Sequence, residues 1–175
     1  MRAASDRAFA QARQRLHLPA LSWLNAQLLD GAERMQMAPR WCGFRLVAAD
    51  ASVLMPAVRA CHRTASAASA DQRLFALYLP GAELTLHAGV HSARESERAM
   101  LMESLDKLGA DDVLLLDRGY PAAWLVQALH ERGIRFVMRC DNDSGWPAVR
   151  SFVRSARAEV VVTLNVPSAR RRRSC

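Results

Sequence analysis

The strongest constraint on the fold of this chain is a short apolar run that ends in a carboxylate. Positions 113 to 116 read Val-Leu-Leu-Leu, and Asp117 follows at once. Such a run predicts a strand covered on both faces, as in the middle of a sheet flanked by helices. Gly119 permits a tight exit, and a helix is expected from Pro121 to Arg132. Asp117 then either caps that helix or lies at the carboxyl end of a buried strand, where open α/β sheets collect ligands and metal ions.

Other segments supply the neighbours that such a strand needs. Apolar alternation and turn residues predict strands over positions 43–50, 73–79, 83–88 and 135–140. The first of these ends in Asp50, and the second and third form a hairpin through Pro80 and Gly81. A capping box of Ser92 and Glu95 predicts the start of a helix that Gly109 ends.

The order of these elements predicts an α/β fold. A three-strand meander is followed by helix, strand, helix and strand, which resembles the ribonuclease H-like fold with its mixed sheet and flanking helices. The first and fourth strands of that fold lie side by side. We therefore expect Asp50 and Asp117, which are 67 positions apart, to become neighbours in space.

Residues 1–40 are expected to form a short helical segment rather than a domain. Ser5 and Asp6 favour a helix start, Pro19 interrupts that helix, and a second helix closes at Gly31. Two short helices bury too little apolar surface to form a core of their own. The core is therefore expected over 41–140, with a further segment over 141–175.

The charge balance favours a polyanionic partner such as DNA. The net charge is +7, and only Lys107 among the 24 basic residues is a lysine. A genome rich in arginine codons is the alternative explanation. No apolar run approaches the ~20 residues that cross a bilayer, and the first fifteen residues lack a signal-peptide core, so a cytoplasmic protein without a membrane partner is expected. The four cysteines form no metal-binding pair and are expected to be reduced.

Two adjacent aspartates at strand ends would repel each other unless a cation lies between them. Carboxylate oxygens suit Mg²⁺ or Mn²⁺, and a pair of such ions can activate a nucleophile and stabilise the leaving oxygen at a phosphodiester. That chemistry needs a third acidic ligand. The candidates that follow Asp117 in the chain are not well placed for it: Glu131, Asp141, Asp143 and Glu159. His87 and His91 have the i, i+4 spacing of a helical metal pair but fall in a strand and its exit loop, which favours ordinary core or surface histidines.

Short motifs along most of residues 5 to 140 resemble those of the DDE-type insertion-sequence transposases. Within that family the chain is most similar to the branch named after insertion sequence four, whose ribonuclease H-like core is interrupted by a mostly β insertion domain. The motifs are Ser5-Asp6-Arg7-Ala8-Phe9 with Gln11-Ala12-Arg13, Asp50-Ala51-Ser52, Asp117-Arg118-Gly119-Tyr120 and Phe136-Val137-Met138-Arg139.

The resemblance implies a site, a cofactor and partners. Asp50 and Asp117 would be the first two catalytic, metal-binding acids, holding Mg²⁺ or Mn²⁺. The surrounding motif would comprise Arg118, Gly119, Tyr120 and Arg139. The implied activity is metal-dependent cleavage and strand transfer at transposon ends, with double-stranded DNA as partner, a possible homodimer, and a location on a bacterial chromosome.

The third acid of the family has no counterpart here. In this branch the catalytic glutamate lies beyond the insertion domain, in a motif of tyrosine, arginine, glutamate and lysine. Residues 141–175 resemble only the start of that domain, followed by a basic tail with an arginine run at 170–173 that is expected to be disordered. A truncated copy that is inactive by itself is therefore expected.

Two further readings of the chain stay open. The protein could be a non-catalytic DNA-binding remnant that occupies transposon ends or pairs with an intact transposase, or it could fail to form a stable fold. Arg150, Arg154 and Arg157 are spaced to form a basic helical stripe along a phosphate backbone, although a plain solvated face is an equal alternative.

Overall fold

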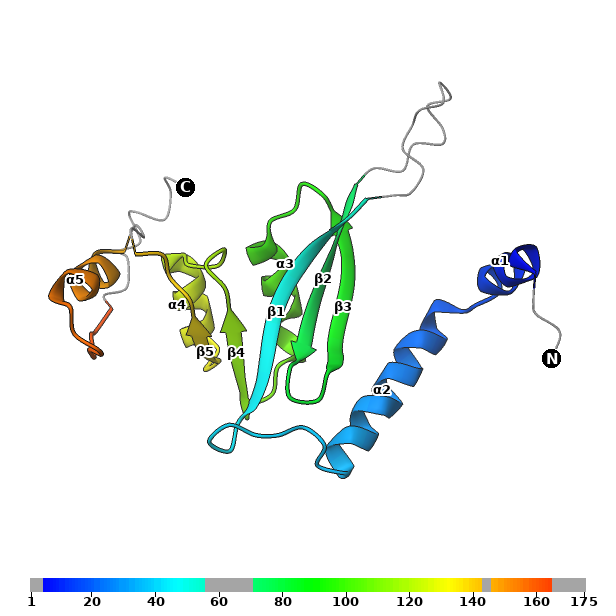
Figure 1. Ribbon diagram of the computed structural model, residues 1–175, viewed down its shortest axis with the longest axis horizontal. Coiled ribbons are helices and arrows are strands. Elements are labelled where there is room, and N and C mark those ends of the chain that lie inside the picture. The colour runs from blue at the N-terminus through cyan, green and yellow to red at the C-terminus, as the bar shows by residue number, and fades with distance from the viewer. Residues whose placement is uncertain (1–4, 56–70, 143–145, 165–175) are drawn as a thin grey trace, which may run out of the picture. The chain divides into compact units, whose positions relative to one another are not determined.

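The computed structural model describes residues 5–55, 71–142 and 146–164 (Figure 1). In chain order its elements are α1 (Asp6–Gln14), α2 (Leu18–Arg34), β1 (Arg45–Leu54), β2 (Gln72–Leu79), β3 (Leu84–Ser92), α3 (Glu97–Ser104), the short 3₁₀ helix η1 (Leu105–Lys107), β4 (Asp112–Leu116), α4 (Ala123–Glu131), β5 (Arg135–Met138) and α5 (Pro147–Ser155). The chain divides into two compact units, Met1–Pro39 and Arg40–Cys175. Within the described residues no helix is both long and apolar enough to span a bilayer.

The first unit holds the two predicted N-terminal helices. Ser5 is the N-cap of α1, and its Oγ accepts a hydrogen bond from the Ala8 backbone N–H at 3.2 Å. The second helix differs from the prediction at both ends. Pro19 lies in the first turn of α2, where its missing N–H costs nothing, and α2 runs through Gly31 to Arg34.

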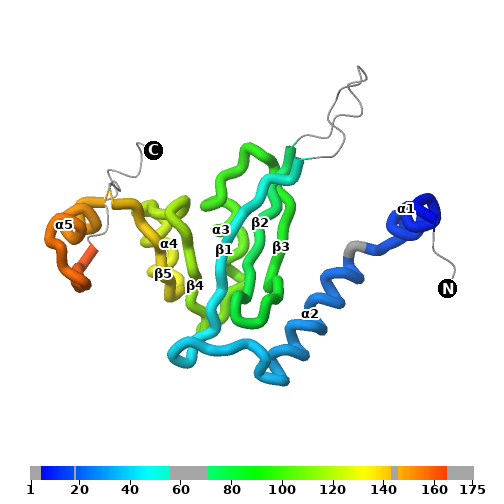
Figure 2. Tube along the Cα trace, in the orientation of Figure 1, coloured from blue at the N-terminus to red at the C-terminus, as the bar shows by residue number. Residues whose placement is uncertain are grey.

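The second unit is built on one five-stranded sheet in the order β3-β2-β1-β4-β5. The pairs β1–β2 and β2–β3 are antiparallel, whereas β1–β4 and β4–β5 are parallel. Figure 2 shows β1 running between β2 and β4. This mixed sheet with crossover helices confirms the predicted α/β class, and its strand order is the ribonuclease H-like one.

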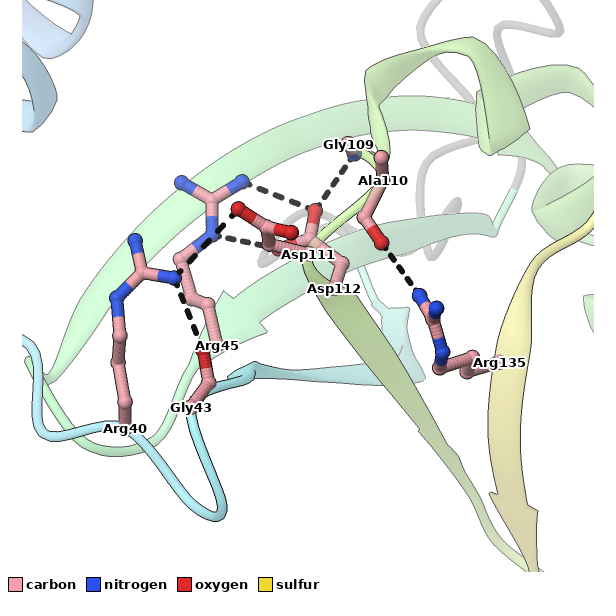
Figure 3. Close-up of polar contacts among 8 residues, drawn as sticks. All are labelled: Arg40, Gly43, Arg45, Gly109, Ala110, Asp111, Asp112 and Arg135. Atoms are coloured by element: carbon pink, nitrogen blue, oxygen red, sulfur yellow. Dashed lines mark hydrogen bonds and ion pairs between the residues drawn. The ribbon is translucent and has the colours of Figure 1, made fainter.

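A buried ion pair fastens the starts of the two central strands (Figure 3). Arg45 at the start of β1 donates two hydrogen bonds, of 2.7 and 2.9 Å, to the carboxylate of Asp112 at the start of β4. Asp112 is 3% exposed, and its Oδ2 also accepts from the Gly109 backbone N–H at 2.7 Å. The two residues are register partners, so the pair fixes the β1–β4 alignment at an offset of 67 residues.

The core lies on one face of this sheet. Val47, Phe75, Leu77 and Leu114 are completely buried there, and register pairing puts their side chains on the same side. Helix α3 packs against β1 and β2, and α4 packs against β5. The fully buried side chains that these helices contribute are Met100, Leu101, Leu125 and Leu129. The opposite face is more open, with Tyr78, Val90 and Val137 exposed.

Several predicted boundaries in the second unit were also wrong. Asp50 does not end its strand, because β1 continues to Leu54 while it pairs with β2. Ser92 does not cap α3, since it is still paired in β3, and the N-cap is Ser96, whose Oγ accepts from Ala99. Helix α4 begins at Ala123 rather than at Pro121.

Candidate metal centre

Asp50 on β1 and Asp117 just after β4 are separated by the same 67 positions as the register partners of these two strands. The register pairs run from Arg45 with Asp112 to Ala48 with Leu115, and Asp50 and Asp117 lie two positions beyond the last of them. Both aspartates are exposed, and Asp117 directly follows the last residue of β4. The two carboxylates are therefore accessible from solvent at the place where the parallel strands deliver their side chains.

A third carboxylate, which the sequence analysis did not consider, lies beside Asp117. A Cβ placed on Gly119 would lie 3.0 Å from Asp117 Oδ1 and 3.3 Å from Glu97 Oε2. One small volume therefore touches oxygens of both side chains. Glu97 is the first residue of α3, and the signal that could have found it is the Ser96 cap immediately before it. We call Asp50, Asp117 and Glu97 the acidic cluster.

The buried hydroxyl of Tyr120 lies within reach of this cluster. Burial raises the pKa of the phenol most, and the negative charges of Glu97, Asp117 and Asp50 raise it further, in that order. Tyr120 is 1% exposed, and its hydroxyl finds no hydrogen-bond partner among the described residues. Among the described residues the Tyr120 hydroxyl is thus a buried polar group without a hydrogen-bond partner.

The loop that carries Asp117 is fixed by three contacts. Asp117 Oδ1 accepts a hydrogen bond from the Gly119 backbone N–H at 2.8 Å, which closes a local turn. From α3, Arg98 donates to the carbonyl oxygens of Tyr120 and Pro121 at 3.2 and 3.4 Å. The N-cap of α4 is Ala122, without a side-chain cap, so Asp117 does not cap that helix.

Arginines lie around the acidic cluster. Arg73 forms an ion pair with Glu97 at 3.4 Å, both side chains being about one third exposed. Arg118 points to Asp141 at 3.6 Å. The backbone N–H of Arg139 donates to the Leu116 carbonyl at 2.9 Å, which ties the end of β5 to the end of β4. Of these three arginines, Arg73 is the one whose guanidinium contacts a carboxylate of the acidic cluster.

The other predicted acids do not join this cluster by any contact in the described residues. Glu131 accepts from Gln127 at the end of α4, Asp141 pairs with Arg118, and Glu159 is exposed. Asp143 and the arginine run at 170–173 lie outside the described residues. The predicted basic stripe is shorter than expected: Arg150 and Arg154 are exposed on α5, but Ala156 has a left-handed backbone (φ 52°), so Arg157 follows the helix end.

Asp117 and Glu97 offer carboxylate oxygens of the kind that a hard divalent cation prefers, but among the described residues the ligand atoms of Asp50, Asp117 and Glu97 do not all lie within 4.8 Å of one another. Gly119 leaves open a space that a Cβ would fill, between oxygens of Asp117 and Glu97. The unpartnered Tyr120 hydroxyl adds a donor for a ligand atom at the same place. A set of carboxylate oxygens is the donor set that Mg²⁺ and Mn²⁺ prefer.

Comparison with known proteins gives one weak likeness. No protein-family model matches the sequence, and no curated protein is similar to it. The chain is weakly similar to one solved structure, the Mos1 transposase paired-end complex with left transposon end, at 11% identity and a TM-score of 0.38. The alignment covers 75% of this chain and 51% of that one, so the chain spans about half the length of that transposase.

Proposed function

We propose that this protein is a transposase-type DNA-processing protein with a divalent-cation site formed by Asp50, Asp117 and Glu97. The observation that supports the proposal is the parallel register of β1 and β4, whose offset of 67 residues, extended by two positions, pairs Asp50 with Asp117. Two carboxylates held close together without a cation would repel each other.

Mg²⁺ or Mn²⁺ held by these carboxylates would supply Lewis-acid stabilisation of charge on a phosphodiester. The chain's own residues would position the carboxylates and donate hydrogen bonds. The turn from Asp117 to Gly119 keeps the Asp117 carboxylate in place, and Arg98 holds the backbone of the same loop. The Tyr120 hydroxyl stays protonated because burial and the nearby carboxylates raise its pKa, so it donates a hydrogen bond rather than acting as a base.

Glu97 is not the glutamate that the family resemblance leads one to expect. That residue follows the insertion domain, whereas Glu97 precedes β4. Glu97 supplies a third carboxylate from inside the sheet unit, and Arg73 partly neutralises it. DDE-type strand cleavage and transfer in an insertion-sequence element would therefore use a ligand set that differs from the family pattern.

The ion pair between Arg73 and Glu97 favours a second candidate function. An arginine that occupies the third carboxylate competes with a cation for it. The protein would then be a non-catalytic DNA-binding remnant that occupies transposon ends or pairs with an intact transposase. The exposed Arg150 and Arg154 of α5 would contribute phosphate contacts in either case.

A plasmid-nicking assay separates the two functions. Supercoiled DNA is incubated with the full chain and Mn²⁺, and duplex binding is measured in parallel as a function of salt. Asp50→Asn and Asp117→Asn should abolish nicking, whereas Asp111→Asn, at an exposed carboxylate just before β4, should retain it.

Each outcome assigns one function. Nicking that depends on Asp50 and Asp117 supports the transposase. Duplex binding that weakens with salt but comes without nicking supports the DNA-binding remnant. Neither activity at low salt contradicts both.

A further inference from the structure

A second group of metal-ligating side chains lies at the edge strand of the sheet. His91 near the end of β3, Glu95 in the following loop and Glu103 on α3 each offer a ligand atom, and these atoms lie within 4.8 Å of one another. His91 Nδ1 is 3.3 Å from Glu95 Oε2 and 3.8 Å from Glu103 Oε2. This group shares no residue with the acidic cluster, and we call it the edge site.

Contacts with neighbouring residues fix the position of the His91 imidazole ring. His91 pairs with Arg73 across β3 and β2, and its ring meets Phe75 edge-on with centroids 6.4 Å apart. A Cβ on Gly89 would lie 2.8 Å from His91 Nε2, so the ring occupies space that only glycine leaves at that position. With one side of the ring occupied in this way, Nδ1 faces the two glutamates.

The two distances from the His91 nitrogen suit a four-coordinate ion, and the two glutamate oxygens lie within 4.8 Å of each other. Zn–N bonds of about 2.0–2.1 Å and Zn–O bonds of about 2.0–2.2 Å in a tetrahedron separate neighbouring ligand atoms by roughly 3.3–3.6 Å. The distances of 3.3 and 3.8 Å from His91 Nδ1 are close to those values. Without a cation, two carboxylates that share one neutral imidazole would repel each other.

We propose that His91, Glu95 and Glu103 bind a divalent first-row transition ion, with Zn²⁺ preferred. An imidazole nitrogen and two carboxylates form a borderline donor set, and such sites bind Zn²⁺ more tightly than Mn²⁺. The ion joins the edge strand β3 to α3. The edge site is thus a structural metal site that links a strand to a helix, and it is separate from the DNA-processing chemistry.

Zn²⁺ titration of the full chain tests the edge site, with Co²⁺ as a coloured substitute that reports coordination. Glu103→Gln is the main variant, because the Glu103 side chain is 63% exposed and its replacement should leave the fold intact. His91→Ala removes the nitrogen ligand. His87→Ala, on the same strand but outside the edge site, is the matched control.

The expected result is a Zn²⁺ equivalent at the edge site, in addition to any that the acidic cluster binds, whose affinity falls at least about tenfold in Glu103→Gln and in His91→Ala, with the His87→Ala affinity unchanged. That equivalent should persist when Asp117 is replaced by Asn, which separates the edge site from the acidic cluster. Binding should also weaken in acid, because a proton competes for the same nitrogen. The proposal is overturned if the full chain binds no Zn²⁺, which leaves a plain ion pair, or if both variants bind Zn²⁺ as the unmodified chain does.

Discussion

Removing Arg45 should destabilise the sheet strongly, because the buried carboxylate of Asp112 would lose its charged partner. Asp112 is 3% exposed and accepts two hydrogen bonds from Arg45 and one from the Gly109 N–H. Replacing Arg45 by Met keeps a side chain of similar length but leaves the carboxylate a single donor. Breaking a buried pair in this way costs about 3–5 kcal/mol. Since 22% of the Arg45 side chain is exposed, we expect the lower end of that range, about 3 kcal/mol.

Urea unfolding followed by circular dichroism measures this loss. Asp111→Asn is the matched control, because Asp111 is the neighbouring residue, its side chain is 78% exposed and its ion pair with Arg40 is 3.9 Å long. Surface pairs of this kind contribute about 0–1 kcal/mol. The double variant Arg45→Met with Asp112→Leu removes both charges and should recover most of the stability.

Two results would refute this reasoning. The first is a loss below about 1 kcal/mol in Arg45→Met, which would mean that the pair is worth no more than a surface ion pair. The second is an equal loss in the exposed control. Either would show that β1 and β4 hold their alignment without this contact.

Three further predictions concern single residues. Gly119→Ala should lower Mn²⁺ affinity at least about tenfold in calorimetry, because its Cβ displaces the Asp117 and Glu97 oxygens, and unchanged affinity would contradict the cluster. Burial and the nearby charge of Lys107 lower the pKa of His87, so folding disfavours the charged form of its imidazole. The free energy of unfolding should therefore fall as the pH drops below about 6.5. Urea midpoints measured across this pH range should show a smaller decline in His87→Gln. Burial and Asp141 raise the pKa of Cys140, so mass spectrometry should find it alkylated more slowly than the exposed Cys42, and equal rates would count against this.

The central strands could be predicted from the sequence because their signals are local. The apolar run before Asp117 has the composition of a strand covered on both faces, and it became β4. Pro80 and Gly81 predicted the turn that joins β2 and β3 into a hairpin. Once these strands are ordered as a ribonuclease H-like sheet, the parallel pairing of β1 with β4 follows, which the structure confirms, whereas the proximity of Asp50 and Asp117 stays a prediction.

The features of the fold and the sites that the sequence did not predict depend on contacts between residues that are distant in the chain. The extension of β1 beyond Asp50 comes from its pairing with β2. Glu97 was not among the predicted acids because the capping box at Ser92 predicted too early a helix start, and because the family resemblance implies a third acid after Asp117. The spacing along the chain related His91 to His87. In the structure the neighbours of His91 are instead Glu95, which precedes α3, and Glu103, which lies within α3.

The central claim is that Asp50 and Asp117 together hold a divalent cation. The most direct measurement is Mn²⁺ binding followed by electron paramagnetic resonance, in a chain that carries His91→Ala so that the edge site is not counted. Asp117→Asn in this background should weaken Mn²⁺ binding at least about tenfold, while Asp111→Asn should leave it unchanged. Equal Mn²⁺ affinity with and without the Asp117 carboxylate would contradict the claim.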